Sequence, residues 1–168
     1  PRDHPENGIE RHPWIDAQAK CQLYDQFFTD ETRRIAISSY FGLCTFLDHN
    51  IGKILRALDS SGESSKTRVI YTSDHGDNLG ARGLWGKSNM YEESVGLPLI
   101  TAGPDIPKSK KFKTPVSVLD FYPTILDTAG IVPNKDDQAR PGKSLWKIAD
   151  QKDDNGRVVF SEYHAVGA

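Results

Sequence analysis

The chain has 168 residues, of which 37% are hydrophobic and 26% charged, a composition typical of a globular protein with one core. Its net charge is −2, and acidic and basic residues are mixed along it, so it lacks the clustered positive charge of proteins that bind nucleic acid or an anionic membrane. No apolar stretch approaches the roughly 20 residues that a membrane-spanning helix needs. We therefore expect neither nucleic acid nor a membrane among its partners.

Residues 1–29 carry prolines, histidines and charges in no regular period, which indicates an irregular lead-in segment. A long helix is expected next, with Asp30 as its N-cap and a stop at Ser60-Ser61-Gly62. Apolar residues recur along it at the helical spacings of three and four: Tyr40, Leu43, Cys44, Leu47, Ile51, Ile54, Leu55 and Leu58. Cys44 lies on this stripe and is expected to be a buried free thiol. A disulfide with Cys21 is the alternative, and the two cysteines leave the compartment, cytoplasmic or periplasmic, open.

Two short apolar runs follow, and both predict buried strands: Arg68–Thr72 and Leu97–Thr101. A second helix is expected over Asp120–Ala129. Pro123 falls in its first turn, where proline is tolerated, and Gly130 supplies the stop.

The polar stretch Lys135–Arg140 is expected to be a loop, and Arg157–Phe160 is expected to be a last strand. This order of helices and strands predicts the α/β fold class, with a mixed sheet flanked by helices. The chain stops soon after the expected last strand, with no helix to complete the layer. We therefore interpret residues 1–168 as a single partial domain.

A polar cluster, Ser73-Asp74-His75-Gly76-Asp77, comes directly after the first strand. Ligands in open α/β sheets bind at the carboxyl ends of strands, and Gly76 permits a sharp backbone turn there. A carboxylate and an imidazole suit Mn²⁺, Zn²⁺ or a Ca²⁺ site that accepts one nitrogen. Two ligands are too few for a complete site, so the others must come from elsewhere in the fold. The alternative is a plain turn in which Asp74 caps the next segment.

The run TSDHGDNLGARGLWGKSNMYEESVGLPLI, residues 72–100, resembles the signature of the sulfatase branch of the alkaline phosphatase superfamily. The shared features are an Asp-His-Gly metal pair after a strand, a Gly-rich loop, a lysine before an aromatic and acidic stretch, and a short strand. The Asp-His version resembles choline-sulfatase-like and phosphonate-monoester-hydrolase-like members. The resemblance covers most of residues 30–168. It implies a partial sulfatase/alkaline-phosphatase-like fold, in which the chain is the later half of the catalytic domain.

By this resemblance Asp74 and His75 are metal ligands, with Ca²⁺ as the favoured ion and Mn²⁺ or Zn²⁺ as alternatives. Lys87 is the catalytic and substrate-binding cation that reaches the sulfate oxygens and the departing oxygen, where a fixed ammonium stabilises developing negative charge. A solvated surface lysine is the alternative for Lys87. His164, after the expected last strand, is a further substrate-binding candidate, with a position away from the pocket as the alternative. Arg82 is either an anion-binding residue or a solvated loop arginine.

The implied activity is hydrolysis of a small sulfated substrate by a metal-dependent sulfuric ester hydrolase. The alternatives are a phosphonate or phosphate monoester hydrolase of the same superfamily, with a phosphorylated substrate, or a non-catalytic truncated module. Members of the family attack with a formylglycine made within a Cys/Ser-x-Pro-x-Arg motif. Neither Cys21, Cys44 nor any serine here begins that motif, so we expect the nucleophile in a missing part and no turnover by the isolated chain. An exposed edge on the Arg68–Thr72 strand would predict a homo-oligomer.

Overall fold

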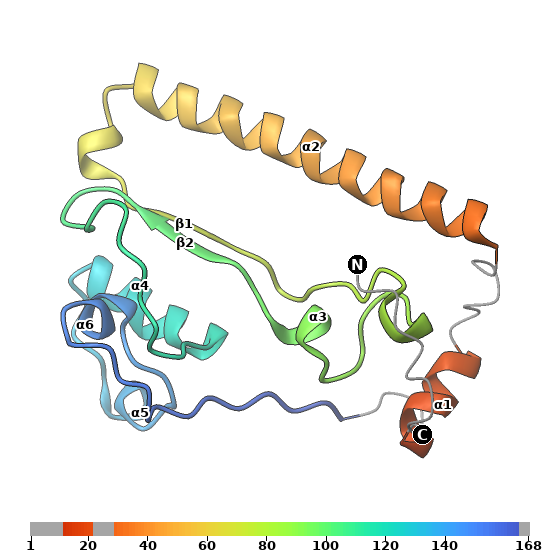
Figure 1. The fold of residues 1–168 in the computed structure, drawn as a ribbon. Coiled ribbons are helices and arrows are strands. Elements are labelled where there is room, and N and C mark those ends of the chain that lie inside the picture. Colours follow the sequence, from red (N-terminus) through yellow and green to blue (C-terminus); the bar gives the residue numbers. More distant parts are fainter. Residues whose placement is uncertain (1–11, 22–28, 165–168) are drawn as a thin grey trace. The chain divides into compact units, whose positions relative to one another are not determined.

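A computed structural model describes residues 12–21 and 29–164 (Figure 1). Contacts divide the chain into two compact units, unit 1 (Pro1–Ile106 with Tyr163–Ala168) and unit 2 (Pro107–Glu162). Among the described residues, no helix combines the length and the apolar character needed to cross a bilayer.

Unit 1 begins with helix α1 (Pro13–Cys21), in a stretch that was expected to be irregular. Pro13 occupies the first helical position, where its missing N–H costs no hydrogen bond. The carbonyl of His12 accepts from the N–H of Ile15 at 2.8 Å, and Asp16 and Lys20 suit the charges of the two helix ends. The remainder of the expected lead-in segment, residues 1–11 and 22–28, lies outside the described residues.

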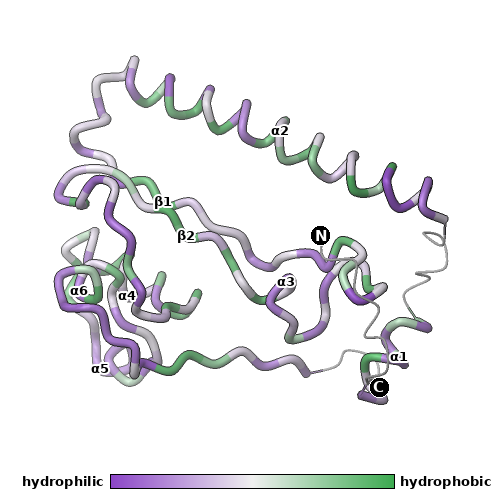
Figure 2. The backbone as a smooth tube through the Cα atoms, viewed as in Figure 1, coloured by the Kyte–Doolittle hydropathy of each residue, from purple (hydrophilic) through white to green (hydrophobic). Residues whose placement is uncertain are grey.

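Helix α2 (Asp30–Ser60) confirms the long helix. Its N-cap is Thr29 and not Asp30, because the Thr29 hydroxyl accepts from the N–H of Thr32 at 3.1 Å. Hydrophobic residues recur along α2 (Figure 2), yet none of its residues is buried. The expected burial of Cys44 is therefore wrong, since the described chain does not cover this apolar stripe. Cys44 and Cys21 are both free and exposed, which confirms the free thiols.

A short 3-10 turn, η2 (Ser64–Lys66), leads from α2 into a two-stranded antiparallel sheet. Strand β1 (Val69–Thr72) pairs with β2 (Leu99–Ala102), so that Val69 lies opposite Ala102 and Thr72 lies opposite Leu99. β2 begins two residues later than expected, after Pro98, whose nitrogen cannot donate to a strand ladder. The combination of helices with a sheet is as expected, although the sheet of the described residues is small and antiparallel.

Unit 2 consists of the 3-10 turn η4 (Val118–Asp120) and helices α4 (Phe121–Thr128), α5 (Lys135–Gln138) and α6 (Leu145–Ala149). α4 and its stop at Gly130, which has a φ of 67°, confirm the expected second helix. The expected loop at Lys135–Arg140 is wrong. Asn134 caps α5, because its side-chain oxygen accepts from the N–H of Asp137 at 2.9 Å. The Asp137 carboxylate in turn accepts from the N–H of Asn134 at 3.1 Å, and this reciprocal pair starts a helix.

The expected strand at Arg157–Phe160 is also wrong, because the structure shows irregular backbone there. Apolar Val158 and Phe160 are exposed, at 67% and 78%, and pair with no strand in the described chain. The segment is held instead through the side chain of Arg157, which reaches the start of α4.

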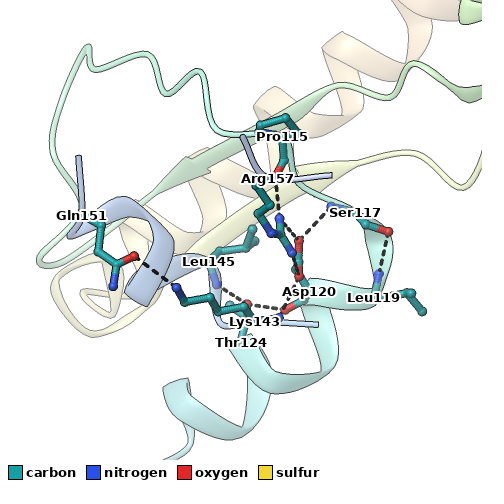
Figure 3. Close-up of polar contacts among 9 residues, drawn as sticks. All are labelled: Pro115, Ser117, Leu119, Asp120, Thr124, Lys143, Leu145, Gln151 and Arg157. Atoms are coloured by element: carbon teal, nitrogen blue, oxygen red, sulfur yellow. Dashed lines mark hydrogen bonds and ion pairs between the residues drawn. The ribbon is translucent and has the colours of Figure 1, made fainter. Parts of the chain in front are cut away.

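Asp120 is fully buried. It is the hub of unit 2, since several segments contact its carboxylate (Figure 3). Arg157 contacts both of its oxygens, with Nη2 2.7 Å from Oδ1 and Nη1 3.0 Å from Oδ2. The backbone N–H groups of Ser117 and Lys143 donate to the same carboxylate, each at 2.8 Å. One side chain thus joins η4, the segment before α6 and the segment after α6.

The hydroxyl of Thr124 extends this hub toward α6. It donates to the Asp120 carbonyl at 2.6 Å and accepts from the N–H of Leu145 at 2.8 Å (Figure 3). Gly142 permits the approach, since its φ is 113° and a Cβ there would collide with the Leu119 carbonyl. The polar groups of this buried cluster are therefore paired.

Removing Arg157 is expected to destabilise unit 2, because Asp120 becomes a buried carboxylate without its charge partner. Arg157→Ala should lower the free energy of unfolding by about 3–5 kcal/mol. Arg157→Lys should recover only part of the loss, since lysine cannot make the bidentate contact. Urea denaturation measures the change, and faster hydrogen exchange at the Lys143 and Leu145 amides locates it.

Arg140→Ala is the control, because Arg140 is 62% exposed and its Nε lies 3.8 Å from Asp137. Its cost is expected to stay below about 1 kcal/mol. Equal costs for the Arg157 and Arg140 variants would show that the Asp120 cluster does not hold unit 2 together.

The Tyr122 hydroxyl donates to Asp137 at 2.5 Å. This bond, followed by the N–H of Asn134, lowers the pKa of Asp137, and the same bond raises the pKa of Tyr122. Because the folded pKa of Asp137 is depressed, its stabilising effect is present above the unfolded pKa and is lost as pH falls through the folded value. Carboxyl NMR of Tyr122→Phe should show the Asp137 pKa moving up, and an unchanged pKa would contradict this coupling.

Candidate functional site

Hydrogen bonds to backbone carbonyls hold the turn that follows β1. The Ser73 hydroxyl donates to the His75 carbonyl at 2.8 Å, and the N–H of Gly76 donates to the Ser94 carbonyl at 2.9 Å. A Cβ on Gly76 would collide with the carbonyl of Glu93, so glycine is needed for this close approach. The end of β1 is thereby fixed to helix α3 (Glu92–Val95), which leads into β2.

Asp74 and His75 present their side chains together on this turn. Oδ2 of Asp74 lies 3.6 Å from Nε2 of His75, and the two side chains are 84% and 40% exposed. Nδ1 of His75 lies 2.8 Å from the Gly76 carbonyl. Because a carbonyl only accepts, Nδ1 carries a ring proton, and in the neutral ring Nε2 then carries the lone pair.

These two donors fit a shared cation. Ligand atoms 3.6 Å apart can both reach one ion with bonds of about 2.0–2.6 Å. The described residues contain no group of three or more His, Cys, Asp or Glu side chains placed to hold a metal. Asp74 and His75 therefore supply only part of a coordination shell, as expected from the sequence, where two ligands are too few for a complete site.

The Asp74 carboxylate is stabilised in its charged form. A hydrogen bond from its own backbone N–H is the main cause that lowers the pKa of Asp74, and the N–H of His75 and the positive charge of Lys87 add to it. Asp74 is thus a carboxylate at neutral pH, the form in which it can bind a cation.

The structure brings Lys87 to the same turn. Its Nζ donates to Nε2 of His75, across twelve residues of chain, although the lysine side chain is itself exposed. The 3-10 turn η3 (Ala81–Gly83) and Gly86 lie between them. An ammonium, an imidazole and a carboxylate therefore meet at the end of β1, an arrangement that can bind an anion and a cation next to each other.

Arg82 is occupied by a different contact. Its Nη1 lies 2.7 Å from Glu93 Oε2, and its guanidinium lies 4.1 Å from the centre of the Tyr91 ring. Arg82 therefore ties η3 to α3 and is not a plain solvated loop residue, while its anion-binding role stays a prediction.

His164 is exposed, next to Tyr163, whose ring centre lies 6.0 Å from that of Trp14. Its assignment as a substrate-binding residue stays a prediction.

One residue of this site was not singled out from the sequence. Gln18 of α1 donates through Nε2 to the Lys87 carbonyl at 2.6 Å, a contact across 69 residues that no local pattern predicts. From the sequence, Asp77 and Asn78 are turn residues by default, with a contact behind the proposed ligands as the alternative. Asn78 is 1% exposed and donates through Nδ2 to the Gly86 carbonyl at 2.7 Å. Asp77 does follow that default, since its carboxylate accepts from the N–H of Leu79 at 2.7 Å.

The chain was compared with known proteins. The family model named Sulfatase matches residues 9–131. A choline-sulfatase from Rhizobium meliloti is 39% identical over 111 residues, which are 66% of this chain and 22% of that protein. The chain spans between 19% and 27% of the length of the first curated relatives that it matches.

Two solved structures also resemble this chain. A phosphonate monoester hydrolase from Silicibacter pomeroyi superposes with a TM-score of 0.79 at 28% identity, over 92% of this chain and 32% of that one. A protein solved in complex with its substrate D-glucosamine-2-N,6-O-disulfate superposes with a TM-score of 0.56 at 35% identity, over 72% of this chain and 25% of that one. The resemblance found in residues 72–100 is therefore confirmed, together with a partial alkaline-phosphatase-like fold: this chain belongs to the sulfatase family.

Proposed function

We propose that residues 1–168 are the later half of a sulfatase catalytic domain, and that the complete protein hydrolyses small sulfate monoesters. The observation that carries this proposal is the meeting of Lys87, His75 and Asp74 at the end of β1, within the stretch that matches the family. The comparison with a structure that binds a disulfated glucosamine supports a sulfated substrate class.

In this proposal Lys87 is the catalytic and substrate-binding cation. Cleavage of a sulfate ester breaks the bond from sulfur to the leaving oxygen, and negative charge grows on that oxygen. An ammonium held beside it stabilises the charge more in the transition state than in the ground state. The attacking group that the family implies, a formylglycine, lies outside this sequence, which contains no Cys/Ser-x-Pro-x-Arg motif.

Asp74 and His75 are proposed as two ligands of a divalent cation, Ca²⁺ by preference, with Mn²⁺ or Zn²⁺ as alternatives. A bound cation would supply a Lewis acid that holds the sulfate oxygens. Nε2 of His75 has a single lone pair, so it cannot accept from Lys87 and bind a cation at once. The Lys87 ammonium is then available for the oxygens of the substrate.

His164 is proposed as a second substrate-binding residue. A homo-oligomer is proposed as well, because each strand of the β1–β2 sheet has one edge without a partner strand in the described chain.

A phosphonate or phosphate monoester hydrolase is the second candidate, and the superposition on the Silicibacter pomeroyi enzyme favours it specifically. The two reactions differ in the charge of the transferred group. A comparison of kcat/KM for a 4-nitrophenyl sulfate and a phenylphosphonate ester separates the candidates, and faster cleavage of the phosphonate would reverse their order.

Lys87→Ala in the complete protein is expected to lower kcat for sulfate monoesters by about 10²–10³-fold, the usual cost of one lost charge-stabilising donor. Steady-state kinetics on a primary alkyl sulfate, whose leaving oxygen keeps its charge, measure the loss. Lys66→Ala is the matched control, since Lys66 is an exposed lysine of unit 1 whose Nζ lies 3.6 Å from Glu63. A Lys87 variant as active as the Lys66 variant would remove Lys87 from the chemistry.

Asp74→Ala is expected to weaken cation binding, since it removes one of the two ligands proposed in this sequence. Calorimetric titration of Ca²⁺, Mn²⁺ and Zn²⁺ into the protein and the variant measures the change. Asp48→Ala on α2 removes a carboxylate elsewhere and should leave the affinity as it is. Lys87→Met should also retain binding, because it frees Nε2 of His75. Unchanged affinity in Asp74→Ala would exclude Asp74 as a ligand.

A further inference from the structure

Residues 75–87, the path from His75 to Lys87, contain only the short 3-10 turn η3 as regular structure. The position of the Lys87 ammonium therefore depends on the contacts that hold this backbone. Several of its residues have a positive φ, a conformation that local preference does not hold in place. They are Leu79, Gly80, Arg82, Gly83 and Gly86. Hydrogen bonds to this backbone are therefore needed to keep Lys87 where it meets His75.

Asn78 fixes the peptide group that precedes Lys87. Its backbone N–H and its Nδ2 both donate to the Gly86 carbonyl, each at 2.7 Å, and its own carbonyl accepts from the N–H of Ala81 at 2.8 Å. The side chain is 1% exposed, so water competes little for these bonds. Asn78 thus links the beginning of this segment to Gly86, the residue before Lys87.

Gln18 fixes the peptide group that follows Lys87. From helix α1, its Nε2 donates to the Lys87 carbonyl at 2.6 Å, and the side chain is 4% exposed. The Gly86 and Lys87 carbonyls belong to the two peptide groups that flank the Lys87 Cα. Holding both carbonyls restricts φ and ψ of Lys87, and with them the direction in which its side chain leaves the backbone.

Both amides leave one buried atom without a partner in the described chain, namely Oδ1 of Asn78 and Oε1 of Gln18. A buried polar atom without a hydrogen bond is costly, and an apolar side chain of similar size would avoid that cost. The amides are therefore explained by what their N–H groups hold and not by their contribution to stability.

We propose that Asn78 and Gln18 are positioning residues for Lys87, which clamp the backbone on both sides of it so that its ammonium stays at the Asp74–His75 turn. This inference rests on the proposed function, in which Lys87 stabilises the leaving oxygen. The two residues act through Lys87 and touch no reacting atom.

The test uses Asn78→Asp and Gln18→Glu, which keep the side-chain shape but replace the donor by an acceptor that repels a carbonyl oxygen. The first readout is ¹⁵N NMR of the His75 ring in the cation-free protein, where Nε2 accepts from Lys87, with Lys87→Met as the reference for a lost contact. Both variants are expected to shift the Nε2 resonance toward that reference. Asn155→Asp and Gln151→Glu make the same changes at exposed amides of unit 2 and should leave the resonance in place.

The second readout is the dependence of rate on the leaving group. In the complete enzyme, Asn78→Asp and Gln18→Glu should lower kcat for a primary alkyl sulfate by about 100-fold, the scale of loss expected from a small misplacement of a catalytic group. The loss on 4-nitrophenyl sulfate should be less than about tenfold, because the nitrophenolate spreads its own charge. A merely structural defect would lower both rates by the same factor.

An Nε2 resonance that stays at its original position in both variants, or equal losses on both substrates, would overturn the clamp. If Asn78→Asp does not fold, Gln18→Glu decides alone, since its change lies on α1. If the unmodified enzyme cleaves no sulfate ester, the proposed function fails, while the NMR readout still decides whether Asn78 and Gln18 position Lys87.

Discussion

The hydrogen bond from the Gly76 N–H to the Ser94 carbonyl, 2.9 Å long, is the contact on which the site depends. It closes the chain between β1 and β2 into a loop, so that the residues at the end of β1 and the Lys87 segment share one small region. Without a Cβ at Gly76 the two backbones can approach this closely. The carboxylate, the imidazole and the ammonium then meet, even though the connecting chain contains only short turns.

Local patterns predicted the elements whose signals are local. Strand β1 and helix α2 follow from apolar runs and helical spacing, and the Asp74-His75-Gly76 turn follows from its place after a strand. The failures have a common physical cause, which is that they depend on distant partners. Cys44 lies on an apolar stripe that the described chain does not cover, and Arg157 begins an apolar run that is held by a buried carboxylate instead of a strand. Gln18 contacts Lys87 across 69 residues, which no spacing rule reveals.

The two units use buried polar groups in opposite ways. In unit 2 the Asp120 carboxylate is paired on both oxygens, so its burial specifies a single arrangement of the segments around α4 and α6. In unit 1 the buried amides of Asn78 and Gln18 each lack one partner in the described chain. A fully paired cluster is typical of a structural hub, whereas partly paired groups are typical of sites where function competes with stability.

The contacts of Arg82 place a joint constraint on three positions. Its φ of 55° is unusual for a residue with a Cβ, and it is accompanied by the ion pair with Glu93 and the stacking on Tyr91. Lysine could not reproduce the planar stacking, so an exchange of one basic residue for the other is not conservative here. Loss of Glu93 or of Tyr91 would likewise remove a reason to keep the arginine. Over evolutionary time these three residues should therefore change as a set, and not one by one.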